Sequence, residues 1–154
     1  MQFDGVDDYV NVGDKDSLDA GTSDFSIATW VKFAVYEPDG YRDNIVFKQN
    51  VTPPRHGYIL SIRGSLDETN YNRPYFMLGL GTSSSVPMTG TSTINDGIWH
   101  HLLVSVNRNG YMKLYRDGIF ESQVDISAYS AQNEDTNIPL TIGGISDTGF
   151  TING

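Results

Sequence analysis

The stretch that decides the fold alternates in polarity over ten residues: Ile98-Trp99-His100-His101-Leu102-Leu103-Val104-Ser105-Val106-Asn107. One set of alternate positions holds Ile98, His100, Leu102, Val104 and Val106, and the other holds Trp99, His101, Leu103 and Ser105. This period of two is typical of a β-strand with one buried face. Asn109-Gly110 and Asp117-Gly118 follow, and both pairs are hairpin signals because their residues tolerate positive φ. The region therefore predicts three antiparallel strands over 98–107, 112–116 and 119–124.

The rest of the chain repeats this pattern, with turn residues about every ten positions. In 25–33 the apolar residues fall on odd positions, and no segment sustains a helical period. Further strands are expected over 9–12, 25–33, 44–48, 57–63, 73–80, 86–94 and 139–143. The polar stretches 37–43, 51–56, 65–72 and 127–137 are expected to be surface loops. Many short strands joined by turns indicate an all-β sandwich or barrel without a long helix.

The composition argues against several classes of chemistry and of binding partner. The 154 residues fit one domain, and the absence of cysteine excludes disulfides and thiol chemistry. With 19 acidic and 10 basic residues the net charge is −9, which argues against nucleic acid as the main partner. No apolar run is long enough to span a bilayer, and Met1 is not followed by a signal peptide. We therefore expect either an excised domain or a protein made without secretion, such as a phage structural protein.

A cluster of acidic residues precedes the first expected strand. Asp4, Asp7 and Asp8 lie around Gly5, just before strand-like sequence. Such carboxylates either form solvated turns by bonding their own backbone or gather around a hard cation such as calcium, which takes six to eight oxygens. If calcium is present, the ligands are expected to be Asp4, the Gly5 carbonyl, Asp7 and Asp8.

Five motifs in series resemble the laminin G-like group of the concanavalin A-like lectin/glucanase superfamily. They are residues 3–10, 25–31, 96–101, 114–118 and 140–144. The resemblance implies a jelly-roll sandwich of two curved antiparallel sheets, one bound calcium, and a surface for sugar or protein. Family members often end in a further strand with an acidic residue for the metal, and this sequence stops near its start, at 150–154. The resemblance therefore implies a domain lacking its closing strand and a calcium site that is weak or missing.

The resemblance also implies roles for aromatic and histidine residues inside strands. Trp30 and Trp99 are expected in the core rather than in a sugar site. His100 and His101 face opposite sides of a strand, so the two cannot jointly bind one metal, and His100 is expected to pack and hydrogen-bond within the sheet.

Catalysis is not expected. Retaining glycosidases of this superfamily present paired carboxylates from one strand as Glu-x-Asp-x-x-Glu or a close variant. That pattern is absent, and the chain has only four glutamates: Glu37, Glu68, Glu121 and Glu134. Three are expected in loops and Glu121 beside a hairpin.

Two loops gather the residue types that sugar sites use, namely tyrosine rings and side chains that form several hydrogen bonds. The candidate ligand-binding residues are Tyr36, Tyr41, Arg42, Asp43, Asn70, Tyr71, Arg73 and Tyr75. The alternative is that these tyrosines only pin long loops to the sandwich. We expect a non-catalytic module that binds glycan as part of a larger secreted, surface or phage tail protein. The alternative function is a virion or surface assembly domain that contacts a neighbouring protein subunit. Either would act outside the cell, at its surface or on a virion.

Overall fold

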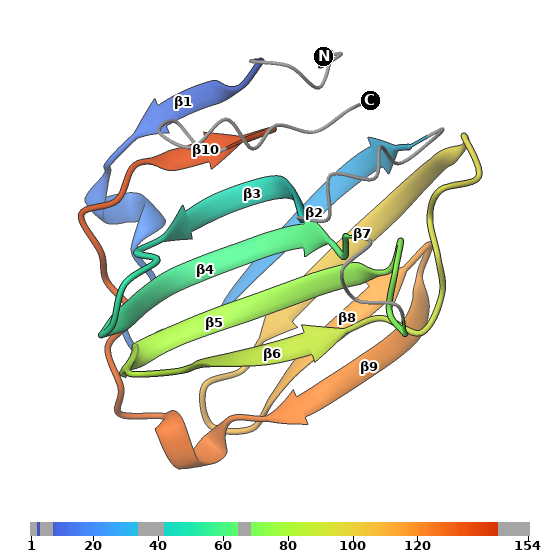
Figure 1. Cartoon of the computed structure of the whole chain (residues 1–154). Helices are drawn as coiled ribbons and strands as arrows, with labels where there is room; N and C mark the ends of the chain where they lie inside the picture. The colour runs from blue at the N-terminus through green and yellow to red at the C-terminus, as the bar shows by residue number, and fades with distance from the viewer. Residues whose placement is uncertain (1–2, 4–7, 34–41, 65–68, 145–154) are drawn as a thin grey trace.

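The computed structural model describes residues 3, 8–33, 42–64 and 69–144. These residues form short strands and two single-turn 3-10 helices (Figure 1). The strands are β1 (Val10–Gly13), β2 (Phe25–Lys32), β3 (Asp43–Gln49), β4 (Arg55–Ile62), β5 (Pro74–Thr82), β6 (Ser85–Thr89), β7 (Trp99–Val106), β8 (Tyr111–Arg116), β9 (Ile119–Asp125) and β10 (Leu140–Ile142). The helical turns are η1 (Asp16–Leu18) and η2 (Ser127–Tyr129). Within this described part, no helix has the length and apolar character needed to cross a membrane.

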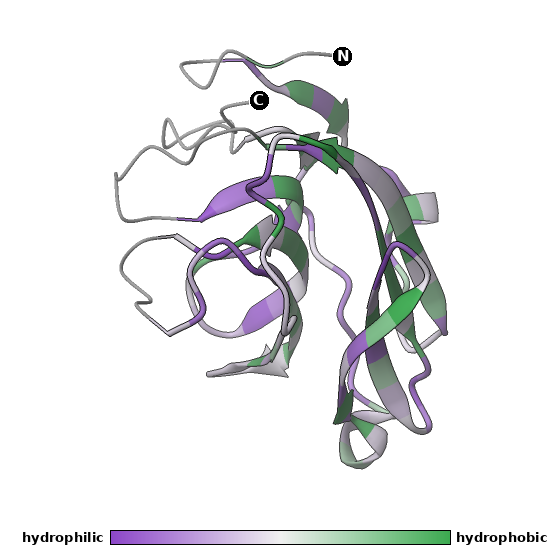
Figure 2. Cartoon of the chain, turned by 90° about the vertical axis from the view of Figure 1, so that its right-hand side faces the viewer, coloured by the Kyte–Doolittle hydropathy of each residue, from purple (hydrophilic) through white to green (hydrophobic). Residues whose placement is uncertain are grey.

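The strands form two antiparallel sheets that face each other as layers (Figure 2). One sheet has six strands in the order β1-β10-β3-β4-β5-β6, and the other has four in the order β2-β7-β8-β9. The first described strand, β1, is an edge strand that pairs with β10 near the other end of the chain. The predicted all-β jelly-roll sandwich of two sheets is confirmed.

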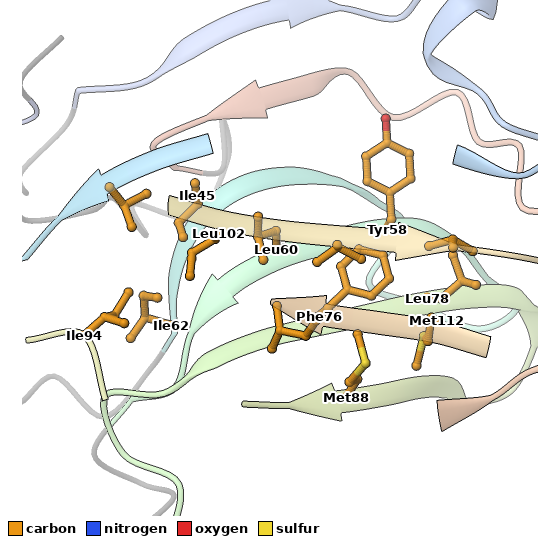
Figure 3. Close-up of a cluster of buried hydrophobic side chains, with 14 of the residues drawn as sticks. Ile45, Tyr58, Leu60, Ile62, Phe76, Leu78, Met88, Ile94, Leu102 and Met112 are labelled. Carbon is orange, nitrogen blue, oxygen red and sulfur yellow. The ribbon is translucent and has the colours of Figure 1, made fainter. Parts of the chain in front are cut away.

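The main core fills the space between the two sheets (Figure 3). Leu60, Phe76 and Leu78 come from the six-stranded sheet, and Leu102 and Met112 come from the four-stranded sheet. All five have no exposed surface. Each large side chain buried in this way contributes about 1.5–3 kcal/mol, so we expect this layer to be the main source of stability.

A second, smaller cluster lies on the opposite face of the six-stranded sheet. Phe47, Ile59, Tyr75 and Met77 are buried there, and Ile138 packs against them. The register explains the grouping, because Phe47 pairs with Ile59 and Ile59 pairs with Met77, which places all three side chains on one face. The central strands of the six-stranded sheet, β3, β4 and β5, are therefore buried on both faces.

The predicted strands are present, with local differences. The expected strand 86–94 ends at Thr89, and Ile94 is fully buried in a loop instead. Asp117 and Gly118 have φ of 53° and 78°, as the hairpin signal requires. Asn109-Gly110 does mark a hairpin, but neither residue has positive φ. There the N–H of Asn107 donates to the Tyr111 carbonyl at 3.1 Å, so three residues rather than two make the turn. The side chain of Asn107 supports this loop by accepting a bond from the N–H of Asn109 at 3.0 Å.

The prediction that Trp30 and Trp99 are core residues is wrong. Their side chains are 63% and 57% exposed, on the face of the four-stranded sheet that points away from the core. The strand period decides this, because Val31 and His100 occupy the inward positions and their immediate neighbours must point outward. The family resemblance implied buried tryptophans, whereas the alternation of side chains along β2 and β7 places them on the outer face, where the structure has them.

Candidate functional site

A tyrosine ring covered by arginines lies where β4 ends and β5 begins. The guanidinium carbon of Arg63 is 3.9 Å from the centre of the Tyr75 ring, and that of Arg42 is 4.8 Å from it. Tyr75 is only 3% exposed, whereas both arginines are partly exposed. Two cation–π contacts therefore hold the arginines in place over a buried ring.

Strand register builds this cluster. Ser61 on β4 pairs with Tyr75 on β5 and with Asn44 on β3. Arg63 lies two residues beyond Ser61, so it points to the same face of the sheet as Tyr75. Arg42 immediately precedes β3, the neighbouring strand, and reaches the same ring.

A tight turn places further polar groups beside the arginines. The N–H of Arg63 donates to the Arg73 carbonyl at 2.9 Å, and that of Asn72 donates to the Arg63 carbonyl at 3.0 Å. Asn72 has a φ of 61°, which asparagine tolerates better than most residues. The Arg73 guanidinium donates to the side-chain oxygen of Asn70 at 3.4 Å. The turn thus brings Asn70 and Arg73 to the same end of the sheet as Arg63.

The arginines influence each other electrostatically. Burial lowers the pKa of Arg42 below its usual value, and the positive charges of Arg63 and Arg55 act in the same direction. An arginine stays protonated despite such a shift in pKa, because a guanidinium group is not deprotonated in proteins. Arg42, Arg55 and Arg63 therefore lie close enough for their positive charges to act on one another, in a chain whose net charge is −9.

The structure places several predicted ligand-binding residues at one end of the six-stranded sheet. Arg42 lies over the Tyr75 ring, Arg73 bonds Asn70, and Tyr71 belongs to the same turn as Asn70. Asp43 begins β3, pairs with Ile62 and is buried. Tyr36 and Tyr41 lie outside the described residues. Tyr75 was expected to offer its own ring to a ligand, but the ring is 3% exposed and lies beneath Arg42 and Arg63. We refer to Arg42, Arg63, Asn70, Tyr71 and Arg73 as the arginine rim.

The predicted calcium ligands fall mostly outside the described residues. Asp4, Gly5 and Asp7 are not among the described residues, whereas Asp8 is described and is exposed. Among the described residues, no three histidine or acidic side chains converge in a way that could hold a metal ion. Calcium at the acidic motif remains a prediction.

The two glutamates that the structure describes are buried and interact with other residues of the fold. Glu121 accepts bonds from the N–H groups of Thr91 and Ser92 at 2.6 and 2.9 Å, and from the side chain of Arg116 at 3.2 Å. Glu134 is 1% exposed and lies 4.0 Å from Arg108, which is equally buried. Burial raises the pKa of Glu134 to about 8, although the charge of Arg108 acts in the opposite direction. Neither glutamate has a surface from which to act on a substrate. Glu37 and Glu68 lie outside the described residues.

His100 is confirmed as a structural residue. It is 2% exposed, and its two ring nitrogens lie 2.8 Å from Asp117 and 3.0 Å from Asp96. Burial alone would lower its pKa, but the hydrogen bonds to Asp117 and Asp96 outweigh burial and raise it. Asp117 also accepts a bond from the backbone N–H of His101, so one carboxylate joins β7 to the β8–β9 hairpin.

Sequence reasoning missed the exposed aromatic face of the four-stranded sheet. Trp30, Trp99 and Phe120 are each more than half exposed. The signal was present in the sequence, since Trp30 and Trp99 occupy the positions opposite the apolar ones in their strands.

Comparisons with known proteins agree with this architecture. A laminin G-type family model, described as the concanavalin A-like lectin/glucanases superfamily, matches residues 4–154. No curated protein sequence matches significantly. Three solved structures illustrate the similarity of fold. The binding domain of Paraclostridial Mosquitocidal Protein 1 is 18% identical, with a TM-score of 0.70 over 100% of this chain and 38% of that chain.

The other two are a candidate carbohydrate-binding protein from Bacteroides ovatus and the LG4-5 domains of the mouse laminin alpha1 chain. The Bacteroides protein is 15% identical, with a TM-score of 0.66 over 94% of this chain and 37% of that one. The laminin domains are 14% identical, with a TM-score of 0.64 over 99% of this chain and 37% of that one. This chain thus spans less than two-fifths of each solved chain, and at these identities the likeness concerns the fold.

Proposed function

Because the chain belongs to the concanavalin A-like lectin/glucanases superfamily, we propose that it is a non-catalytic module that binds carbohydrate through the arginine rim. The observation that carries the proposal is the stacking of Arg42 and Arg63 on the Tyr75 ring. These contacts fix two guanidinium groups before a ligand arrives, so binding need not order them. Tyr36 and Tyr41, which precede Arg42 in the sequence, are proposed as further contacts, whereas Asp43 is buried at the start of β3.

The chemistry of the arginine rim suits a sugar. Each guanidinium presents several N–H donors in a planar fork, which matches neighbouring hydroxyl groups or a carboxylate. Asn70 adds an amide, and Tyr71 adds a partly exposed ring for the apolar face of a sugar. A few convergent polar groups beside an aromatic ring are typical of small-ligand sites.

Similar proteins and the buried glutamates support a binding role without catalysis. The similar solved structures include a toxin binding domain, a botulinum neurotoxin type C structure that concerns its interaction with two ganglioside molecules, and a candidate carbohydrate-binding protein. A glycosidase needs a pair of carboxylates that its substrate can reach. Glu121 and Glu134 are instead buried, where Glu121 bonds Thr91 and Glu134 lies beside Arg108. As part of the same proposal, the module acts outside the cell, at its surface or on a virion, within a longer protein.

A glycan array tests the proposal. We expect the wild-type chain to bind a defined set of glycans, and the double variant Tyr41→Ala/Tyr71→Ala to bind them roughly tenfold more weakly. Arg73→Gln removes one guanidinium without touching Tyr75 and should have a similar effect. Tyr129→Ala is the matched control, because Tyr129 is an exposed tyrosine in η2, away from the arginine rim. An array without hits, or full binding by the double variant and by Arg73→Gln, would contradict the proposal.

One observation favours a second candidate function, assembly with a neighbouring protein subunit. β1 is an edge strand of the six-stranded sheet and pairs, among the described strands, only with β10. Such an edge can accept a strand from another chain. Size-exclusion chromatography with light scattering tests this function. A single monomeric species at high concentration would count against assembly between copies of this chain.

A further inference from the structure

The outer face of the four-stranded sheet carries two tryptophans as neighbours. Trp30 on β2 pairs with His101 on β7, and Trp99 on β7 pairs with Lys32 on β2. The two indoles are therefore diagonal neighbours on one face of adjacent strands, within reach of each other. The Trp30 ring lies 5.2 Å from the His101 ring, at a tilt of 55°.

The aromatic surface continues across the remaining strands. Leu103 on β7 pairs with Tyr115 on β8, and Tyr115 pairs with Phe120 on β9. The Tyr115 and Phe120 rings meet edge to face, with centres 5.9 Å apart. All four strands thus present an apolar or aromatic side chain to this face. Since neighbouring strands lie about 4.8 Å apart, the surface extends over roughly 14 Å. We call Trp30, Trp99, His101, Tyr115 and Phe120 the aromatic platform.

The size of the aromatic platform points to a small ligand. Trp30, Trp99 and Phe120 are 63%, 57% and 52% exposed. Together these three rings expose on the order of 400 Å², within the range of patches that are often functional on monomeric proteins. A standard protein–protein interface buries about 800 Å² per partner. The platform is therefore about half the area that a stable protein partner needs, and it fits a short oligosaccharide.

The polar groups around the rings fit the same ligand. Lys32, Lys113 and Gln123 belong to this face, because they pair with or lie beside outward-facing positions of the sheet. These side chains and His101 supply donors for sugar hydroxyls. The carboxylate of Asp117, at the margin, is already bonded to His100 and to the N–H of His101. Rings interspersed with donors suit a molecule that has both an apolar face and hydroxyl groups.

From these observations we infer that the aromatic platform is a second carbohydrate-binding surface, which takes flat β-linked glucan chains by stacking pyranose rings on Trp30 and Trp99. A β-linked glucopyranose has equatorial hydroxyls and axial C–H groups, so each ring face is apolar and each edge is polar. The aromatic rings of the platform suit the apolar faces of the sugar rings, and Lys32, His101 and Gln123 can donate hydrogen bonds to the hydroxyl groups at their edges. This surface lies on the opposite sheet from the arginine rim, and either site can exist without the other.

The test uses cellohexaose as the probe and maltohexaose as the comparison, because the α-linked chain is coiled rather than flat. Isothermal titration and tryptophan fluorescence follow binding to the whole chain. We expect cellohexaose to bind and to perturb the fluorescence, with maltohexaose at least tenfold weaker. Trp30→Ala and Trp99→Ala should each weaken binding roughly tenfold, and the double variant should abolish it. Trp99→Phe, which keeps a ring, should retain part of the affinity.

Two controls separate this inference from the proposed function. Tyr129→Ala removes an exposed ring elsewhere and should bind cellohexaose as the wild type does. Tyr41→Ala/Tyr71→Ala affects the arginine rim and should also leave cellohexaose binding unchanged. Circular dichroism and melting curves check that the tryptophan variants remain folded, as expected for outward-facing positions.

The inference is wrong if cellohexaose does not bind, if the double tryptophan variant binds it normally, or if the Tyr41→Ala/Tyr71→Ala variant abolishes binding. It is also wrong if the wild-type chain is a dimer that the tryptophan variants convert to a monomer, because the face would then be an interface between copies of this chain.

Discussion

The two sheets of this sandwich differ in how many faces they bury. In the six-stranded sheet, Pro74 to Leu80 on β5 are all buried, with alternate side chains in the main core and in the smaller outer cluster. In the four-stranded sheet, β2 and β7 bury one face and expose the other. A strand buried on both faces contributes to stability with every residue. A strand buried on one face has a second face that is available for binding.

This difference is visible in residue types. β5 reads as an almost continuous apolar run, Pro74-Tyr75-Phe76-Met77-Leu78-Gly79-Leu80, whereas β7 alternates. Continuous apolar strands are typical of sheets covered on both sides. The exposed tryptophans are large apolar side chains at outward positions of this alternating sheet, and the aromatic platform is proposed on that ground.

The largest effect is expected in the main core. Phe76 has no exposed surface and lies between the sheets. Phe76→Ala should lower the free energy of unfolding by about 3–5 kcal/mol, since it removes buried contacts and leaves a cavity. Urea denaturation followed by circular dichroism measures this change. A loss below about 1 kcal/mol would show that the layer between the sheets is not the main source of stability.

A second large effect is expected on the other face of the same sheet. Met77 neighbours Phe76 in sequence but packs with Phe47 and Ile59 in the outer cluster. Met77→Ala should cost about 2–3 kcal/mol in the same denaturation experiment. A cost near zero would mean that the six-stranded sheet, like the four-stranded one, depends on only one buried face.

The edge of the six-stranded sheet is expected to respond to calcium. If Asp4, Asp7, Asp8 and the Gly5 carbonyl bind the ion just before β1, calcium should raise the melting temperature by mass action. At 100 times the dissociation constant this corresponds to about 2.7 kcal/mol. Melting curves in millimolar calcium and in EDTA measure the effect, and Asp4→Asn/Asp7→Asn should remove it. Identical curves for the wild-type chain would eliminate the site.

A smaller, pH-dependent effect is expected at the inner face of the four-stranded sheet. Hydrogen bonds to Asp117 and Asp96 raise the pKa of His100 in the folded chain above its ordinary value. The stabilisation is therefore fully present below the unfolded pKa of about 6.5, and it is lost as pH rises through the folded pKa. It should amount to less than about 1 kcal/mol, because the partner carboxylates are exposed. Denaturation at several pH values, with His100→Asn as a pH-insensitive comparison, reveals the contribution.

The smallest effect on stability is expected at the exposed tryptophans. Trp30→Ala and Trp99→Ala should each change the free energy of unfolding by less than about 0.5 kcal/mol, whereas a buried tryptophan would cost about 3–5 kcal/mol. Denaturation curves for the two variants decide between these values. A loss of several kcal/mol would indicate that both tryptophans are buried, and the aromatic platform would then have no physical basis.

Local patterns predicted the secondary structure well, because strand period and turn chemistry act over a few residues. Asp117-Gly118 adopted the expected positive φ angles. The candidate site was predicted in part. Tyrosine and arginine were recognised as binding groups near 42 and 70–75, but local patterns gave no sign that Tyr75 would be buried beneath Arg42 and Arg63. That contact depends on register between β3, β4 and β5, which no single segment specifies.

The sequence by itself determined which residues of each strand share a face, since successive side chains of a strand must point to opposite sides. It therefore already placed Trp30 opposite Val31 and Trp99 opposite His100. Only the tertiary structure decided which of these faces meets another layer, because burial depends on what packs against a sheet. In the six-stranded sheet, β3, β4 and β5 are covered on both sides, whereas the outer face of β2, β7, β8 and β9 is not. The same alternation that builds the core thus leaves the tryptophans in solvent.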